Sequence, residues 1–490
     1  MKKFINLSMI IGLVFTLTFI GCEDRSDLTA PSAPSTGSAD FTKLVSIGNS
    51  LTAGYQNSSL YQSGQENSFV KLIADQVGTS FAVPYISEPG IPARLYVNSL
   101  YDAQGNLSPD IKSKEGLGSP LNLDYAAPYN NLGIPGAIIY DVIDETDFAA
   151  KSTARANPYF QIVLRNQALG ASILKQAINL QPTLLTLWIG NNDVLGYATS
   201  GGTKGTDITG TLPTDVNVFN TLYTQIIGGL LQANPNLKIA TANIPNIKAI
   251  PFFTTVGARV AQAITAAQAA NPQVQGLVYF MGDNVTFNVA TPADLASYKV
   301  LLTLVSSPAA AKIGQPFNWY ETVGASVPPN VDVNFPFGVT PQNPWPNAYI
   351  LDQVEIGNVE TATTAFNQTI ANTVAANPNN MVLVNIFSEF NVIASKSGPS
   401  GEGYVTQGVR VKADFISGGL FSLDGVHPTN LGHGIVANMF INAINAKWGA
   451  SIPEVSIASL SGGVPLSKSV QYNAINNIKF PSNFLENLYF

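Results

Sequence analysis

The sequence predicts an α/β fold in which a central parallel sheet is covered by helices on both faces, giving three α/β/α layers. Two observations predict it. Runs such as 183–189 and 381–387 are continuously apolar, which is typical of strands buried on both faces of a parallel sheet. These runs alternate with segments in which apolar residues recur at helical spacing. Such alternation of strand and helix is what a doubly wound sheet requires.

The individual elements follow from periodicity and from capping residues. Ser68 and Gly78 bound one helical segment as a cap and a stop, and Thr214 or Asp215 caps another. Predicted strands cover residues 44–47, 129–134, 183–189, 237–242 and 381–387, with one short further strand near 81–86 in an otherwise extended surface excursion over 79–128. Predicted helices cover residues 68–77, 171–180, 214–234, 257–270, 292–305, 355–376 and 430–448, and another begins within 137–143.

Composition excludes several classes of protein. With 490 residues and 46% hydrophobic content, the chain is long and apolar enough for one large or two moderate folded domains. The net charge is 24 minus 31, or -7, and no run of Lys or Arg occurs beyond the extreme N-terminus. Binding of nucleic acid needs clustered cations, so we expect no nucleic-acid partner.

Histidine and cysteine are scarce enough to narrow the chemistry. The chain has two His, His427 and His433, and one Cys, Cys22. These residues cannot build a His/Cys zinc site or a disulfide within the chain. We therefore expect no metal and no cofactor, and histidine-based proton transfer has to use His427 or His433.

The first 40 residues have the features of an export signal followed by a tether. Lys2 and Lys3 precede an apolar run over 5–20 and then Gly21-Cys22, the pattern of a signal peptide. Residues 18–22 resemble a relaxed bacterial lipobox, which would make Cys22 the lipidated first residue after a signal peptide of residues 1–22. Residues 23–40 suit a flexible tether. We expect a bacterial lipoprotein held at the outer membrane or cell surface; a plain secretory signal, with a secreted or periplasmic product, stays open.

Residues 250–350 interrupt the α/β pattern with many prolines and aromatic residues. This many rings need a surface to cover, so we expect an insertion that packs over the carboxyl edge of the sheet. The rings could wall a pocket for an acyl or aromatic group, or they could form a small core of their own. The main domain is thus expected to span 41–450, with this insertion inside it.

The C-terminal end is expected to lie outside the main domain. Residues 451–485 are interpreted as an extension. Residues 486–490 resemble the recognition sequence of a tobacco-virus protease that is used to remove affinity tags. We therefore expect this last segment to be a tag remnant and assign it no function.

Ser50 is the candidate nucleophile. It follows the predicted strand 44–47, which would place it at the carboxyl edge of the sheet, where open α/β sheets bind ligands. A serine needs a general base and an orienting carboxylate, and Asp424-Gly425-Val426-His427 offers both within one turn. His433 competes as the base, but it has no carboxylate at nearby spacing and lies in a helical pattern, so we expect a structural role for it.

Four short blocks in this chain resemble those of one enzyme family. Residues 48–51 are similar to the GDSL signature of the SGNH hydrolases, and residues 131–137 to the family's glycine block. Residues 190–193 resemble its GxND block and residues 424–428 its DxxHP block. The blocks occur in the family's order and anchor about 41–245 and 355–450. The resemblance implies the flavodoxin-like SGNH hydrolase fold.

The resemblance also implies roles for particular residues. Ser50 would be the nucleophile, His427 its base and Asp424 the carboxylate. The oxyanion hole would comprise the Ser50 N–H, the Gly136 N–H and the Asn192 amide, with Asn191 as the alternative if the alignment is off by one. Asn49 departs from the family's usual Asp. The positions thus implied are Ser50, Asp424 and His427 for catalysis and Ser50, Gly136 and Asn192 for the oxyanion.

The function implied is hydrolysis of carboxylic esters outside the cytoplasm by a serine esterase or lipase, through an acyl-enzyme. The substrate would be a small or polymeric ester. Two alternatives stay open: a carbohydrate O-acetyl esterase, and a non-catalytic surface lipoprotein that binds glycans on a hydrolase scaffold. The apolar insertion favours acyl chains as substrates.

Overall fold

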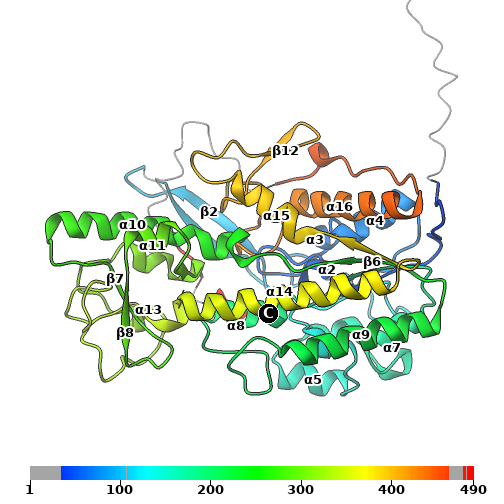
Figure 1. Ribbon diagram of the computed structural model, residues 1–490, viewed down its shortest axis with the longest axis horizontal. Coiled ribbons are helices and arrows are strands. Elements are labelled where there is room, and N and C mark those ends of the chain that lie inside the picture. Colours follow the sequence, from blue (N-terminus) through cyan, green and yellow to red (C-terminus); the bar gives the residue numbers. More distant parts are fainter. Residues whose placement is uncertain (1–34, 106, 463–477, 482, 490) are drawn as a thin grey trace, which may run out of the picture. The chain divides into compact units, whose positions relative to one another are not determined.

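The computed structural model describes residues 35–105, 107–462, 478–481 and 483–489 (Figure 1). The predicted signal peptide, Cys22 and the tether up to residue 34 lie outside the described residues. The fold below is that of the described residues from Thr36 onward. Over the residues that the structure describes, no helix combines the length and the apolar character that crossing a membrane requires.

A five-stranded parallel sheet forms the centre of the fold. Its strands are β1 (Leu44–Gly48), β4 (Asn131–Gly133), β5 (Leu184–Trp188), β6 (Lys238–Ala242) and β11 (Met381–Val384). They lie in the order β11-β6-β5-β1-β4, and every pairing is parallel. The predicted α/β class is confirmed. From β1 the chain goes to β4 on one side and then crosses to β5 on the other, and such a reversal opens a crevice at the carboxyl ends of the strands.

Helices cover both faces of this sheet, as Figure 1 shows. On one face lie α4 (Phe69–Val77) and α16 (Asn430–Trp448); on the other lie α7 (Ile173–Asn179), α9 (Val216–Ala233) and α14 (Gln353–Ala376). Strand side chains alternate between the two resulting cores, as period two requires. One core contains Val45, Ile47, Leu185 and Leu187, and the other contains Leu44, Leu184 and Trp188.

The predicted helix boundaries are reproduced where capping chemistry sets them. The Ser68 side chain accepts a hydrogen bond from the Lys71 N–H, and Gly78 ends α4 with a φ of 71°. The Asp215 side chain caps α9 by accepting from two backbone N–H groups. These local interactions depend on neighbouring residues only, which is why the sequence predicts them well.

The predicted strand at 81–86 is wrong. In the described residues this segment makes one isolated bridge, from Ile86 to Pro120, and side chains supply part of its hydrogen bonds: Gln65 accepts from the Ile86 N–H and donates to the Pro84 carbonyl. The Asn130 side chain accepts from the Ala82 N–H. The regular structure in this excursion is instead an antiparallel hairpin of β2 (Leu95–Tyr101) and β3 (Leu107–Ser113).

Three other predicted elements are shorter than expected. The last strand ends at Val384, and α15 (Ile386–Ser395) follows because the Asn385 side chain caps it through the Ser388 N–H. The helix predicted over 292–305 ends early as α11 (Pro292–Ala296), shortly before Tyr298, which has a φ of 56°. The helix expected within 137–143 is one 3₁₀ turn, η2 (Ile139–Val142).

The insertion is a folded layer beside the sheet. Its long helix α10 (Pro251–Ala270) is followed by a hairpin of β7 (Leu277–Phe280) and β8 (Phe287–Ala290), and β9 (Leu301–Leu302) pairs with β10 (Ile350–Leu351). Its aromatic side chains pack against one another and belong to, or pack against, the same buried cluster as Val45 and Leu185 of the sheet, so they do not form a separate core; they are Phe317, Trp319, Phe337, Trp345 and Tyr349.

The remaining elements are short. They are α2 (Ser50–Ala53), α3 (Gln62–Gln65), α5 (Phe148–Ala154), α6 (Tyr159–Leu164), η3 (Gln167–Leu169), α8 (Asn192–Thr199), η4 (Ile247–Ala249), η5 (Leu304–Ser306), α12 (Ser307–Ala310), α13 (Trp319–Thr322), η6 (Asn347–Tyr349), β12 (Tyr404–Thr406), β13 (Val409–Val411), η7 (Ile457–Ser459) and η9 (Leu485–Asn487).

The end of the chain returns to the main domain. Lys479 exchanges backbone hydrogen bonds with Pro109 and Ile111 at β3. Further on, the Tyr55 hydroxyl donates to the Asn487 carbonyl at 2.5 Å, and the Tyr489 ring lies edge-on to the Tyr55 ring. The segment interpreted as a tag remnant therefore packs against a residue of the α/β domain.

Candidate active site

Ser50 lies immediately beyond the carboxyl end of β1, at the start of α2. The Asn49 side chain caps this short helix through the Leu51 N–H, at 3.1 Å. A side chain at Gly48 would place its Cβ 2.6 Å from the Trp188 carbonyl oxygen, so only glycine fits between β1 and β5. The turn is thus set by local chemistry and by close contact with the neighbouring strand.

The structure brings Ser50 together with the predicted base and carboxylate. The His427 Nε2 lies 2.9 Å from the Ser50 Oγ, although the two residues are 377 positions apart. On the other side of the ring, the His427 Nδ1 lies 3.2 Å from the Asp424 Oδ2. All three side chains are buried. The order carboxylate, imidazole, hydroxyl is the arrangement that activates a serine.

A tight turn holds the carboxylate in place. The Asp424 Oδ1 accepts from the Val426 and His427 N–H groups at 2.9 and 2.8 Å, and its Oδ2 accepts from the Ser58 N–H at 2.9 Å. Burial alone would raise the pKa of Asp424, but the charge of His427 and these hydrogen bonds hold the pKa below its usual value. Asp424 is therefore an ionised acceptor for the imidazole N–H.

A small apolar pocket opens beside Ser50 and His427. Its cavity volume is about 30 Å³. Asn191 and Asn192 also line it, where β5 ends and α8 begins. Apolar side chains form the rest of the wall, among them Trp188, Leu195, Ile244, Ile250, Phe390 and Phe421. From the insertion at 250–350 only Ile250 reaches this wall, so the insertion's aromatic rings do not form the pocket.

Two of the three residues predicted to supply oxyanion donors, Ser50 and Asn192, line this pocket. Asn192 lines it, and its amide donates to the Ala137 carbonyl at 2.9 Å. Asn191 lines it too, and its side-chain amide has no hydrogen-bond partner among the residues described. Gly136 is not among the lining residues. It has a φ of 78° and lies in the loop that follows β4. In this loop the Ile134 N–H donates a hydrogen bond to the Gly48 carbonyl at the end of β1.

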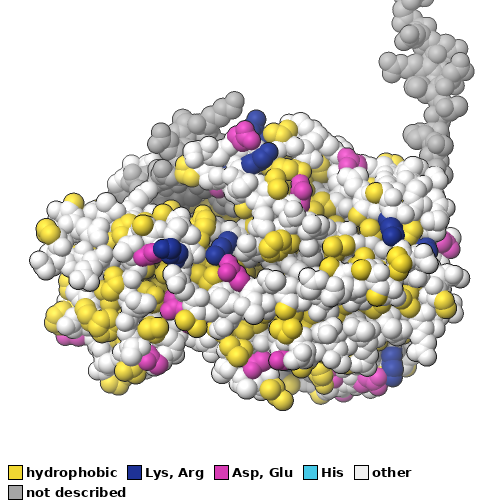
Figure 2. Space-filling model, in the orientation of Figure 1, with side chains coloured by type: hydrophobic (Ala, Val, Ile, Leu, Met, Phe, Trp, Pro, Cys, Tyr) yellow, Lys and Arg dark blue, Asp and Glu magenta, His cyan; other side chains and the backbone are white. Residues whose placement is uncertain are grey.

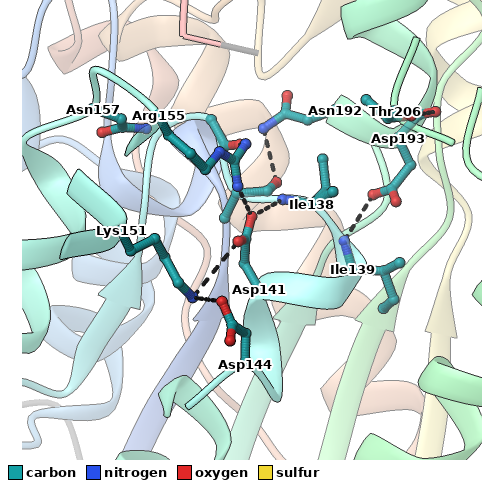
Figure 3. A network of polar contacts seen from close by, with 12 residues as sticks. Ile138, Ile139, Asp141, Asp144, Lys151, Arg155, Asn157, Asn192, Asp193 and Thr206 are labelled. Atoms are coloured by element: carbon teal, nitrogen blue, oxygen red, sulfur yellow. Dashed lines mark hydrogen bonds and ion pairs between the residues drawn. The ribbon is translucent and has the colours of Figure 1, made fainter. Parts of the chain in front are cut away.

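Side chains that the sequence analysis missed clamp the Gly136 loop (Figure 3). Arg155 donates to the Gly136 carbonyl at 3.0 Å and also pairs with Asp141. Asp141 in turn accepts from the Ile138 N–H at 2.9 Å, and Asn157 donates to the Pro135 carbonyl at 2.7 Å. No motif or spacing marks Arg155 and Asn157, because they reach the loop from the segment after α5.

A buried carboxylate supports the same region from the opposite side. Asp193 accepts from the Ile139 N–H at 3.0 Å and from the Thr214 hydroxyl at 2.8 Å. Burial raises the pKa of Asp193 to about 7, against the effect of these hydrogen bonds. Asp193 connects the start of α8 to η2, and so it couples the position of Asn192 to that of the Gly136 loop (Figure 3).

His433 lies apart from this arrangement. It is fully buried in α16, its ring is stacked at 6.5 Å from the Phe69 ring, and neither ring nitrogen has a hydrogen-bond partner in the described part of the chain. Burial, and secondarily the charge of His427, lowers the pKa of His433 to about 3. This side chain stays neutral, as a packing residue. Among the described residues, no three or more His, Cys, Asp or Glu side chains are grouped so that they could hold a metal ion.

Comparisons with known proteins do not assign a function to this site. No family model matches the chain, and no curated protein matches it. Among solved structures, the chain is similar to a candidate GDSL-like lipase from Parabacteroides merdae, with 12% identity, 84% of this chain and 100% of the other covered, and a TM-score of 0.30. A TM-score this low supports no argument about fold or function.

Proposed function

We propose that this protein is a serine esterase of the SGNH type, which hydrolyses carboxylic esters through Ser50, His427 and Asp424. The observation that carries the proposal is the 2.9 Å separation of the Ser50 Oγ and the His427 Nε2, with Asp424 beyond the ring. This alignment of a hydroxyl, an imidazole and a carboxylate beside a pocket is suited to nucleophilic attack on a carbonyl carbon.

The proposed reaction has two halves. As the Ser50 Oγ attacks the ester carbonyl, His427 accepts its proton, and Asp424 stabilises the charged imidazole and keeps its Nδ1 protonated. His427 then gives the proton to the leaving alcohol, which produces an acyl-enzyme. In the second half a water molecule loses a proton to His427 and attacks the acyl carbonyl, and the proton returns to the Ser50 oxygen as the carboxylic acid leaves.

The negatively charged oxygen of each tetrahedral intermediate needs hydrogen-bond donors that stabilise it. We assign the Ser50 N–H, the Gly136 N–H and the Asn192 amide to this role. The pocket position of Asn192 supports its assignment. For Gly136, support comes from the side chains that fix its loop. Donors held rigid before the reaction stabilise the oxyanion without reorganisation, and one donor is worth about 10²- to 10³-fold in kcat.

The size of the pocket indicates the acyl group. A cavity of about 30 Å³ with apolar walls fits a short acyl chain much better than a long one. The same observation favours a second candidate function, removal of O-acetyl groups from carbohydrate. A series of p-nitrophenyl esters from acetate to laurate, measured beside acetate release from acetylated xylan, separates the two candidates and should give the highest kcat/KM at the short end.

Fluorophosphonate labelling tests the proposal directly. The wild-type protein should be labelled at Ser50, and Ser50→Ala should abolish the labelling. Ser46→Ala is the matched control, because Ser46 is also a buried serine of this region but bonds to Thr186 within the sheet. A wild-type protein that remains unlabelled would contradict the esterase and support the non-catalytic, glycan-binding alternative.

We also propose that the protein is exported and anchored by a lipid on Cys22, at the outer membrane or cell surface. The support is the sequence pattern around Cys22. In a bacterial host fed with a labelled fatty acid, the wild-type protein should incorporate label and sediment with membranes. Cys22→Ser should lose both properties. Retention of label in the variant would contradict the anchor.

A further inference from the structure

A second cavity lies away from Ser50. Its volume is about 330 Å³, within the range of small-molecule sites, and it shares no lining residue with the pocket at the serine. Side chains of α10, of α15 and of the segment after β13 enclose it. Figure 2 shows this face of the molecule hollowed where α10 approaches α15. The proposed esterase reaction makes no use of this space.

Arg259 gives the cavity a positive charge that pairs with no acidic side chain among the described residues. It projects from the same face of α10 as Thr255 and Gln262, which also line the cavity. Its Nη1 is buried and has no hydrogen-bond partner within the described ranges. Burial lowers the pKa of Arg259 to about 10, still far above neutral pH, so the group remains a cation. A guanidinium with a buried donor that lacks a partner is costly, and its planar donors match a carboxylate.

Asp414 provides an acceptor in the same cavity. Its side chain is 10% exposed, and its Oδ1 accepts from the Gly398 N–H at 2.7 Å. The Oδ2 is buried without a hydrogen bond, and the Lys412 Nζ is 4.0 Å away. The described residues show no ion pair between Asp414 and Arg259. The cavity thus holds opposite charges that do not neutralise each other.

Several other polar side chains of the cavity wall already have hydrogen-bond or ion-pair partners within the protein. The Lys248 Nζ pairs with Glu360 at 2.7 Å. The hydroxyls of Ser395 and Ser397 donate to backbone carbonyls of α15 at 2.8 and 2.7 Å. Arg259 and Asp414 therefore define what the cavity can bind, with the aromatic ring of Tyr298 beside them.

We propose that this cavity binds a hexuronate, a monosaccharide that carries one carboxylate and several hydroxyl groups. Its carboxylate pairs with the Arg259 guanidinium, and its hydroxyls donate to the Asp414 Oδ2. Inorganic phosphate or acetate satisfies Arg259 but fills little of a 330 Å³ cavity and leaves Asp414 without a donor. A neutral hexose satisfies Asp414 and leaves Arg259 unpaired. The proposal stands independently of ester hydrolysis at Ser50.

Calorimetric titration of the full chain without its signal peptide tests the site. The probes are D-galacturonate and D-glucuronate, with D-galactose, D-glucose and inorganic phosphate as comparisons. A hexuronate should bind saturably and more tightly than the neutral sugars and phosphate. Arg259→Gln should weaken this binding by about 10- to 100-fold, because a charge-assisted hydrogen-bonded pair is lost. Arg410→Gln, which changes an exposed arginine outside the cavity, should leave it unchanged.

Thermal unfolding separates a binding role of Arg259 from a structural one. Without sugar, Arg259→Gln should have a Tm equal to or above that of the wild type, because the substitution removes a partly buried cation whose Nη1 donor is unsatisfied. The hexuronate should raise the Tm of the wild type and not that of the variant. Absence of saturable hexuronate binding to the wild type, equal binding by Arg259→Gln, tighter binding of phosphate, or a lower Tm of the sugar-free variant would each overturn the proposal.

Discussion

The two histidines of this chain make an informative comparison. His427 and His433 are six positions apart, and both are buried. His427 has a carboxylate 3.2 Å from one ring nitrogen and a serine hydroxyl 2.9 Å from the other. His433 lies against Phe69, with no hydrogen-bond partner for either nitrogen in the part of the chain that the structure describes. Burial is common to both residues, so partner geometry alone distinguishes a candidate base from a packing residue.

Replacing each histidine by glutamine is the most direct way to break this comparison. His427→Gln should lower kcat/KM for p-nitrophenyl acetate by about 10⁴-fold or more, because the serine loses its base. His433→Gln should leave kcat/KM close to the wild-type value, since this ring contacts neither Ser50 nor Asp424. Equal losses in the two variants would contradict the distinction.

Removing the Asp424 carboxylate tests whether this partner is what makes His427, and not His433, the catalytic base. Asp424→Asn should lower kcat by about 10⁴-fold, because an amide no longer holds the Nδ1 protonated nor stabilises the charged ring. Asp75→Asn is the matched control, since Asp75 pairs with Lys71 at the surface. Initial rates with p-nitrophenyl acetate measure both. Activity within a few fold of wild type in Asp424→Asn would show that His427 does not depend on its partner.

A pair of neighbouring asparagines tests the proposed oxyanion donors. Asn192→Ala should lower kcat by about 10²- to 10³-fold with little change in KM. Asn191→Ala should have a smaller effect on kcat. Steady-state kinetics of the two variants decides the assignment, and a larger loss in Asn191→Ala would transfer the donor role to that residue.

The clamp on the Gly136 loop predicts a smaller effect. Arg155→Met should lower kcat by about 10- to 100-fold, because a slight displacement of the loop misplaces its N–H, while KM changes little. Added guanidinium should restore part of the kcat. Lys175→Met is the control, since Lys175 pairs with Glu145 at 2.6 Å at the surface and makes no hydrogen bond to the loop among the described contacts. No rescue by guanidinium would argue against a positioning role for Arg155.

The smallest predicted effect concerns stability and belongs to His433. In the fold its pKa is about 3, against roughly 6.5 when unfolded. Between these values only the unfolded chain takes up the proton, so stability is complete above about pH 6.5 and falls as the pH is lowered. From pH 7 to pH 5 the loss should be about 2 kcal/mol.

Urea unfolding of the wild type and of His433→Leu measures this slope. The leucine variant should lose less stability between pH 7 and pH 5, because it has no group there to protonate. Asp424 adds acid sensitivity only at lower pH: its pKa is lowered in the fold, so its contribution is complete above the unfolded value of roughly 4 and declines below it. Parallel pH curves for the two proteins would contradict the assignment.

The sequence predicted the parts of the fold that depend on near neighbours. The five central strands and helices α4, α7, α9, α14 and α16 form where periodicity and caps indicated them. It missed the hairpin of β2 and β3 and helix α15. The segment at 81–86 misled the prediction because its hydrogen bonds go to the Gln65 and Asn130 side chains and to single backbone groups such as the Leu121 N–H, and it joins no sheet among the described residues.

The candidate site likewise has features that the sequence predicted and features that only the tertiary structure decided. Short stretches of sequence predicted that Ser50 follows a buried strand and that Asp424 and His427 share one turn. Caps, turns and strand ends are set by local chemistry, so such predictions need no knowledge of the tertiary fold. Only the tertiary structure placed His427 and not His433 against Ser50, held the Gly136 loop with Arg155, and limited the pocket to about 30 Å³. These outcomes depend on how distant segments pack against one another, and packing is a property of the whole chain.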